Sequence, residues 1–253
     1  MNNALYVGLS RQMTLQREMD VIANNFANSD TVGFKVETLK LETDTQTPVV
    51  QAGGARPSAI NFVRDVGVDR DYSQGALRQT GGTFDLGLQG DGFFQVNTPN
   101  GLRYTRDGRF SLDAKGQVVN LAGDTLQGAG GSPIVIDPLK GAPSIARDGT
   151  ITQIDPKTTT STVVGKVGAV TFADPTALQK TASGQYDNVS NLAAQPARAT
   201  SILQGMLENS NVDSIQMMAR MIAVSRAYES VANMMSQTGD TSDQSIQRLG
   251  RVN

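Results

Sequence analysis

The side chains best suited to chemistry in this chain are carboxylates next to glycines. Asp91, Asp107, Asp124 and Asp148 all have a glycine neighbour. Such oxygens can bind calcium, but no run has the alternating ligands and closing glutamate of an EF-hand, and no Gly-Gly-x-Gly-x-Asp repeat occurs. Asp-Gly pairs are also typical of tight turns. We interpret these aspartates as turn residues and expect no metal site.

Phosphate binding and acid–base catalysis find little support. Gly128–Gly131 is glycine-rich, but Pro133 follows and no Lys-Ser or Lys-Thr does, so the segment matches neither a P-loop nor a dinucleotide fingerprint. A glycosidase requires only two carboxylates at a suitable separation, so a hydrolase stays open as an alternative. Tryptophan is absent and aromatic residues make up 5% of the chain, which leaves few platforms for a sugar ring. We therefore expect a protein that is not an enzyme and uses no cofactor.

Composition excludes several further classes. The chain has no cysteine and no histidine, which removes disulfides, Cys/His zinc sites and Ser-His-Asp triads. A net charge of −2 and a pI near 5.2 argue against a nucleic-acid partner. No segment approaches the roughly 18 apolar residues that span a bilayer, and the first residues lack the basic region of a cleaved secretory signal. We expect a soluble protein, not an integral membrane protein.

Methionine and proline divide the chain into three parts, and these parts must position any site. All nine methionines lie within Met1–Met19 and Met206–Met235, whereas all nine prolines lie between Pro48 and Pro196. Methionine favours helices and packs adaptably, while proline interrupts helices. The division predicts a terminal helix at each end of a non-helical body.

Apolar residues recur at helical spacing in both end segments, in steps of three and four residues. We expect these residues to pack subunits together. The N-terminal packing residues are Leu5, Leu9, Leu15, Met19, Ile22 and Phe26, and the C-terminal ones are Met217, Met218, Met221, Ile222, Val224, Tyr228, Val231 and Met235.

Each predicted helix carries apolar rows on more than one side. A hairpin of the two helices would bury only some of these rows, so we expect the helices to pair as a coiled coil and to complete their burial against other subunits. Ser210 and Asp213, three residues apart just before the C-terminal row, predict a start resembling a capping box.

The middle of the chain has the rhythm of short antiparallel strands. From Gly92 to Gly131, one series of glycines recurs every seven to nine residues and separates pieces rich in Phe, Val, Leu and Tyr; its members are Gly92, Gly101, Gly108, Gly116, Gly123 and Gly131. We predict a mainly β fold with terminal α-helices: a central antiparallel β domain and a helical coiled-coil region. The predicted parts are an N-terminal helix and motif (1–35), an extended connector (36–80), the β domain (81–173), a return linker (174–203) and a C-terminal helix pairing with 1–35 (204–253).

Three segments carry a resemblance to a known family. Asp20–Lys35, which reads DVIANNFANSDTVGFK, resembles the N-terminal signature of the bacterial flagellar rod and hook proteins. Gln204–Asp213, followed by Arg226–Glu229, resembles their C-terminal signature, and Gly90–Phe94 with Tyr104–Phe110 resembles their β domain. The motif residues are Asn24, Asn25, Asn28, Gly33, Phe34 and Lys35. The three asparagines could serve turns, bonds between subunits or a helix cap.

The resemblance implies a non-enzymatic, structural subunit of the flagellar basal-body rod in the periplasm. Such a subunit self-assembles through its terminal helices and transmits torque from motor to hook. Implied partners are other proximal and distal rod subunits and the flagellar type III export apparatus. The short length and the opening Asn3–Gln12 look most like the proximal-rod members. A distal-rod protein and a secreted β-rich binding protein are the alternatives.

Overall fold

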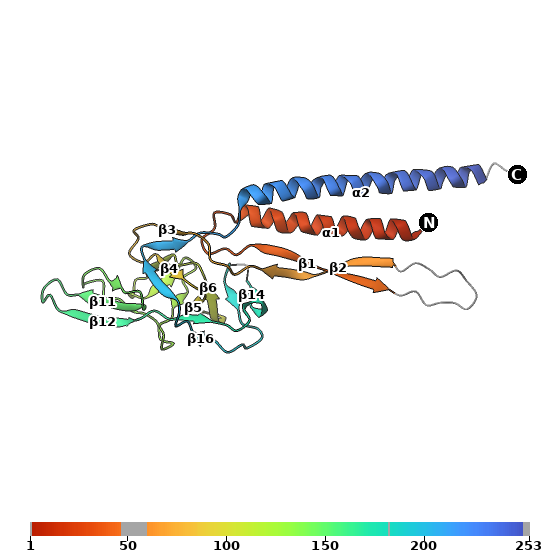
Figure 1. The fold of residues 1–253 in the computed structure, drawn as a ribbon. Helices are drawn as coiled ribbons and strands as arrows, with labels where there is room; N and C mark the ends of the chain where they lie inside the picture. Colours follow the sequence, from red (N-terminus) through yellow and green to blue (C-terminus); the bar gives the residue numbers. More distant parts are fainter. Residues whose placement is uncertain (1, 47–59, 182, 250–253) are drawn as a thin grey trace. The chain divides into compact units, whose positions relative to one another are not determined.

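The computed structural model describes residues 2–46, 60–181 and 183–249 (Figure 1). The chain divides into two compact units, and neither is one continuous stretch of sequence. Unit 1 consists of Met1–Ala27, Glu37–Arg70 and Asp213–Asn253, and unit 2 consists of Asn28–Val36 and Asp71–Val212. The predicted class is confirmed, because a mainly antiparallel β domain lies in the chain between two terminal helices.

Unit 1 contains two long helices and a β-hairpin. Helix α1 (Asn2–Ala27) lies between α2 (Ser214–Leu249) and the hairpin of β1 (Glu37–Gln46) and β2 (Ile60–Arg70) in Figure 1. The helices pack along the apolar rows seen in the sequence, since Leu15, Ile22, Met217 and Val224 are all buried. Packing of these faces therefore stabilises the helical pair.

The start of α2 has a simple local cause. The carboxylate of Asp213 accepts hydrogen bonds from the backbone amides of Ile215 and Gln216, so it is the N-cap. The predicted capping-box-like pair is wrong, because Asp213 itself is the N-cap and the Ser210 hydroxyl accepts a bond from the amide of Val212.

The hairpin of unit 1 differs from the expected extended connector at 36–80. Strands β1 and β2 pair antiparallel from Glu37 opposite Arg70 to Gln46 opposite Ile60. A register shift between Lys40 and Leu41 marks a β-bulge, and β1 has only two aliphatic residues, Leu39 and Leu41, so its apolar alternation is too short to signal a strand. The sequence at 47–59, within the same predicted connector, lies outside the described residues.

Unit 2 is an all-antiparallel β body with one short 3₁₀ turn, η1 (Pro175–Ala177). Its longest sheet has the order β14-β15-β6-β5-β9-β8-β7, with β13 pairing with both β5 and β16. Separate sheets are β10-β11-β12, β17-β4 and β18-β3. The strands are β3 (Leu77–Gln79), β4 (Leu86–Gln89), β5 (Phe93–Thr98), β6 (Gly101–Thr105), β7 (Phe110–Leu112), β8 (Val118–Asn120), β9 (Thr125–Leu126), β10 (Ser144–Ile145), β11 (Thr150–Ile154), β12 (Ser161–Lys166), β13 (Ala169–Thr171), β14 (Gln179–Lys180), β15 (Tyr186–Asp187), β16 (Gln195–Pro196), β17 (Ser201–Gln204) and β18 (Met206–Glu208).

The segment 174–203, expected as a return linker, is part of this body. Strands β14, β15 and β16 join the longest sheet, and β17 pairs with β4. Three of these four strands contain only two residues, too few to give a periodic signal. Residue 182 of the same segment lies outside the described residues.

Two side-chain clusters form the core of unit 2. The larger is mainly aliphatic and includes Val96, Ile151 and the ring of Phe94. The smaller is aromatic, and in it the rings of Tyr104 and Phe172 meet edge to face with centroids 4.8 Å apart. Among the described residues, no helix combines the length and the apolar character required to cross a membrane.

Candidate functional site

The predicted packing residues separate into a buried set and an exposed set. On α1, Leu15 and Ile22 are buried and Met19 is half-buried, whereas Leu9 and Phe26 are exposed. The side chain of Leu5 lies outside the described residues. Leu15 and Ile22 therefore belong to the interior of unit 1.

The same separation holds along α2. Met217 and Val224 are buried, and Met218 and Ile222 are exposed. The remaining predicted residues of α2 are half-buried, namely Met221, Tyr228, Val231 and Met235. Most of the predicted seam is thus used within unit 1, while the neighbouring row is left at the surface.

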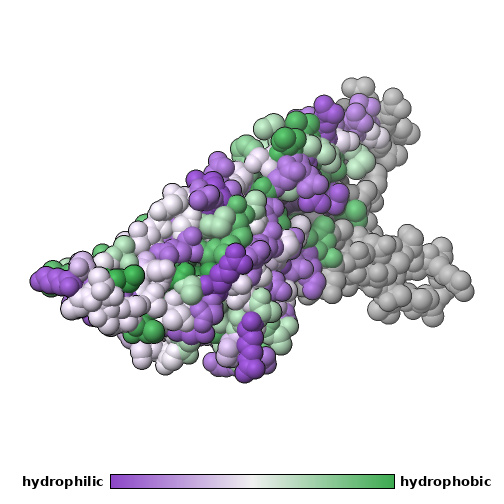
Figure 2. All heavy atoms as spheres, turned by 60° about the vertical axis from the view of Figure 1, so that its left-hand side comes forward, coloured by the Kyte–Doolittle hydropathy of each residue, from purple (hydrophilic) through white to green (hydrophobic). Residues whose placement is uncertain are grey.

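Each helix keeps one exposed apolar row, with members at i, i+3 and i+7. The α1 row is Tyr6, Leu9 and Met13, with side chains 47% to 66% exposed. The α2 row is Ile215, Met218 and Ile222, with side chains 50% to 83% exposed. Figure 2 shows hydrophobic residues (green) reaching the surface among hydrophilic ones (purple) on the face it draws. Apolar rows of this kind are typical of surfaces that bind another protein.

The family-motif asparagines have different local roles. Asn25 is buried, and its amide group donates to the carbonyl of Glu37 at 2.6 Å and accepts from the amide of Glu37 at 2.8 Å. It therefore joins the end of α1 to the start of β1. Asn28 accepts a bond from the Thr31 hydroxyl and closes a turn with its carbonyl. Asn24 is exposed on α1.

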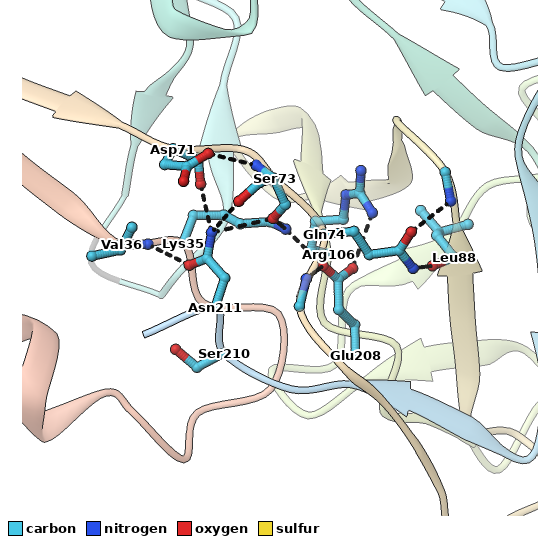
Figure 3. A network of polar contacts seen from close by, with 12 residues as sticks. Lys35, Val36, Asp71, Ser73, Gln74, Leu88, Arg106, Glu208, Ser210 and Asn211 are labelled. Atoms are coloured by element: carbon cyan, nitrogen blue, oxygen red, sulfur yellow. Dashed lines mark hydrogen bonds and ion pairs between the residues drawn. The ribbon is translucent and has the colours of Figure 1, made fainter. Parts of the chain in front are cut away.

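The second half of the motif ends in a buried ion-pair cluster in unit 2 (Figure 3). The ammonium of Lys35 lies 2.6 Å from Glu208 Oε1 and also donates to the carbonyl of Ser73. The guanidinium of Arg106 lies 3.0 Å from Glu208 Oε2. We call these three residues, Lys35, Arg106 and Glu208, the buried triad.

The buried triad holds more positive than negative groups. Two basic side chains share one carboxylate, and Arg106 Nε has no hydrogen-bond partner among the described residues. Burial lowers the pKa of Lys35, although the neighbouring Glu208 carboxylate partly opposes that shift. Arg106 also lies over the ring of Phe93, with 5.5 Å from its guanidinium carbon to the ring centroid.

Asn211 ties together three chain segments beside the triad (Figure 3). Its side-chain oxygen accepts from the amide of Val36 at 2.7 Å. Its side-chain nitrogen donates to the carbonyls of Asp71 and Ser73. Val36, Asp71 and Asn211 all stand within two residues of a point where the chain passes from one unit to the other. The triad and Asn211 therefore form a junction near three ends of the two stretches that make up unit 2.

Close packing explains the two motif residues before Lys35. Gly33 has φ of +69°, and a Cβ there would lie 2.6 Å from the backbone carbon of Arg106. Only glycine fits this position without strain. The ring of Phe34 is buried, and the ammonium of Lys180 lies 3.9 Å from its centroid.

Sequence reasoning assigned no role to Glu208, Arg106 or Asn211. Their signal was present in the quoted motifs, since Glu208 and Asn211 lie in Gln204–Asp213 and Arg106 lies in Tyr104–Phe110. The turn role predicted for Asp107 and Asp148 is confirmed, because each accepts a bond from the amide two residues ahead. Asp124 also closes a turn, because its carbonyl accepts from the backbone amide of Asn120, while its carboxylate accepts from the side-chain amides of Gln185 and Asn120.

Paired terminal helices with apolar rows at the surface are features of a protein that binds other proteins. Three family models match successive parts of the chain. They describe a flagella basal body rod protein at residues 5–35, the flagellar hook protein FlgE/F/G D1 domain at residues 87–172, and the C-terminal part of the flagellar basal body rod FlgEFG protein at residues 203–248.

Full-length relatives agree with these models. The chain is 44% identical to the flagellar basal-body rod protein FlgF of Caulobacter vibrioides, with all of both chains covered. It is 36% identical to FlgF of Mesorhizobium japonicum, with 99% of each covered, and 32% identical to the rod protein FlgG of Bacillus subtilis, with 98% of each covered. The chain belongs to the flagellar basal-body rod protein family and is similar to FlgF. It is a structural subunit of the basal-body rod.

Proposed function

We propose that this chain is a proximal-rod subunit that assembles by burying its exposed helical rows against neighbouring subunits, and that it carries torque through this packing. The observation that supports the proposal is the pair of rows, Tyr6–Leu9–Met13 and Ile215–Met218–Ile222, each at helical spacing and about half exposed or more. Burying six such side chains would stabilise an assembly by roughly 5 to 10 kcal/mol before the cost of association.

The chemistry of the chain supports a mechanical role without catalysis. The triad carboxylate is buried and paired with two basic groups, so it is closed to a substrate. The partners we propose are the other proximal and distal rod subunits. We further propose that the chain reaches the periplasm through the flagellar type III export apparatus, because the N-terminal motif resembles that of exported axial proteins.

The test removes the exposed α2 row and leaves the buried one in place. In the variant Met218→Gln/Ile222→Gln, we expect the purified chain to keep the wild-type melting temperature, because both side chains are exposed. Purified basal bodies should lack the variant. Ser236→Gln, also exposed on α2, is the matched control and should be incorporated normally. Normal incorporation of the double variant would contradict the proposal.

A distal position is the second candidate, because relatives named FlgG are also similar over nearly the full chain. The two positions predict different basal bodies in cells that lack this chain. Loss of a proximal subunit should leave basal bodies without distal-rod protein. Loss of a distal subunit should leave a proximal rod that can be isolated and identified by mass spectrometry.

A further inference from the structure

The motif segment, residues 28–36, contacts both ends of the second stretch of unit 2, through Asp71 and Ser73 at its start and through Glu208 and Asn211 near its end. The Gly33 amide donates to the carbonyl of Glu208 at 2.8 Å, and the Val36 amide donates to the side chain of Asn211. The Asn211 amide donates in turn to the carbonyl of Phe34. Some of the acceptors and donors that hold the motif segment therefore lie at the C-terminal end of the β body.

The charge of Lys35 disfavours docking of the motif segment before Glu208 is in place. Lys35 and Glu208 are 173 residues apart in the sequence and form a buried pair. If the motif segment docked before Glu208 was in place, it would bury the Lys35 ammonium near the Arg106 guanidinium without the carboxylate that pairs with both. A buried charge without its partner is strongly unfavourable, so this premature state is avoided.

Strand pairing gives a second reason for the same order. Glu208 is the last residue of β18, which pairs with β3 through Glu208 opposite Leu77. The Gly75 amide then donates to Glu208 Oε1 at 2.9 Å. The carboxylate is thus fixed by β18 and by the turn before β3, both independent of the motif segment.

We propose that Glu208 is a positioning residue which makes docking of the motif segment conditional on residues 206–211. A chain that lacks this C-terminal stretch, or its carboxylate, keeps residues 28–36 undocked although the rest of the β body folds. The junction therefore makes docking of the N-terminal family motif depend on the presence of the C-terminal one. This inference concerns folding order and holds whether the subunit is proximal or distal in the rod.

The experiment is amide hydrogen exchange by NMR on the full-length chain. In Glu208→Gln, the amides of Gly33 and Val36 should lose on the order of 100-fold more protection than the amides of β5, which should accelerate only with the lower global stability. Glu229→Gln, an exposed site on α2, is the matched control and should leave both sets unchanged.

A double variant tests whether the unpaired charge of Lys35, and not merely the loss of one contact, keeps the motif segment undocked. In Lys35→Met/Glu208→Gln the motif segment no longer brings its own cation into the interior, so Gly33 and Val36 should regain protection relative to Glu208→Gln alone. Exchange that stays as fast as in the single variant would overturn the proposal. So would a uniform acceleration that includes β5, because Glu208 would then be a requirement of the whole body.

Discussion

Lys35 and Arg106 bind opposite oxygens of one carboxylate, that of Glu208. All three side chains are at most 2% exposed. Lys35 comes from the N-terminal family motif, Arg106 from the loop after β6 and Glu208 from the C-terminal family motif. The two signatures of the family are thus in direct contact within one unit.

This sharing of one carboxylate predicts unequal losses on substitution. Glu208→Gln leaves two buried cations without a carboxylate and should lower the free energy of unfolding by about 3 to 5 kcal/mol. Lys35→Met leaves the Arg106–Glu208 pair balanced and should lower it by less than about half as much. Equilibrium denaturation of both variants measures the difference. Equal losses would contradict the prediction, because removing the shared carboxylate would then cost no more stability than removing one of its two cations.

The lowered pKa of Lys35 predicts a pH dependence. Burial lowers this pKa below 10.5 in the folded state, and the charge of Arg106 lowers it further. The carboxylates of Glu208 and Asp71 act in the opposite direction. Between the folded pKa and 10.5 the unfolded chain binds more protons, so stability should rise with pH in that interval. The free energy of unfolding, measured at increasing alkaline pH, should therefore rise in the wild type relative to Lys35→Met. A difference that stays constant with pH would contradict the shift.

Gly33 should be intolerant of any side chain. Gly33→Ala adds left-handed strain and a clash with the Arg106 backbone, so we expect a loss of about 3 kcal/mol or more. Gly81 has a similar φ of +74° but open space where a Cβ would stand, so Gly81→Ala isolates the strain and should cost about 1 to 2 kcal/mol. Thermal unfolding compares the two. Equal costs would mean that the Arg106 backbone moves aside freely.

Asn25 should require its amide nitrogen. Asn25→Asp keeps the acceptor for the Glu37 amide but places a carboxylate oxygen against the Glu37 carbonyl, so we expect a loss of about 3 kcal/mol or more near neutral pH. The loss should shrink in acid, where the protonated side chain can donate again. Circular dichroism of thermal unfolding measures it. Asn233→Asp, exposed on α2, is the control and should change little at either pH.

The helices could be predicted because their packing is local and periodic. Leu15, Ile22, Met217 and Val224 repeat at helical spacing, and each is buried. The same periodicity does not say which apolar residue faces the partner helix. Met218 stands one position after Met217 but is exposed, because that choice depends on the packing of α1 against α2.

The junction could not be predicted because its parts are distant in sequence and follow no period. Nothing in the sequence distinguishes Glu208 and Arg106 from other charged residues. The β body brings both to Lys35, which is 173 residues from Glu208 along the chain. The hairpin at β1 and β2 was missed for a different reason, since Leu39 and Leu41 are the only aliphatic residues of β1 and give too short an alternation. Motif resemblance indicated which segments matter, but only the structure shows their contacts.

The division of the chain into two interleaved units also constrains how recombination can rearrange the genes of such proteins. Both units are assembled from separated pieces of the sequence, with passages after Ala27, Val36, Arg70 and Val212. A single recombination between two related genes therefore exchanges parts of both units and can separate a Lys35 from the Glu208 that matches it. Replacing one unit as a module would require several simultaneous exchanges, so the two halves of this subunit are expected to be inherited together.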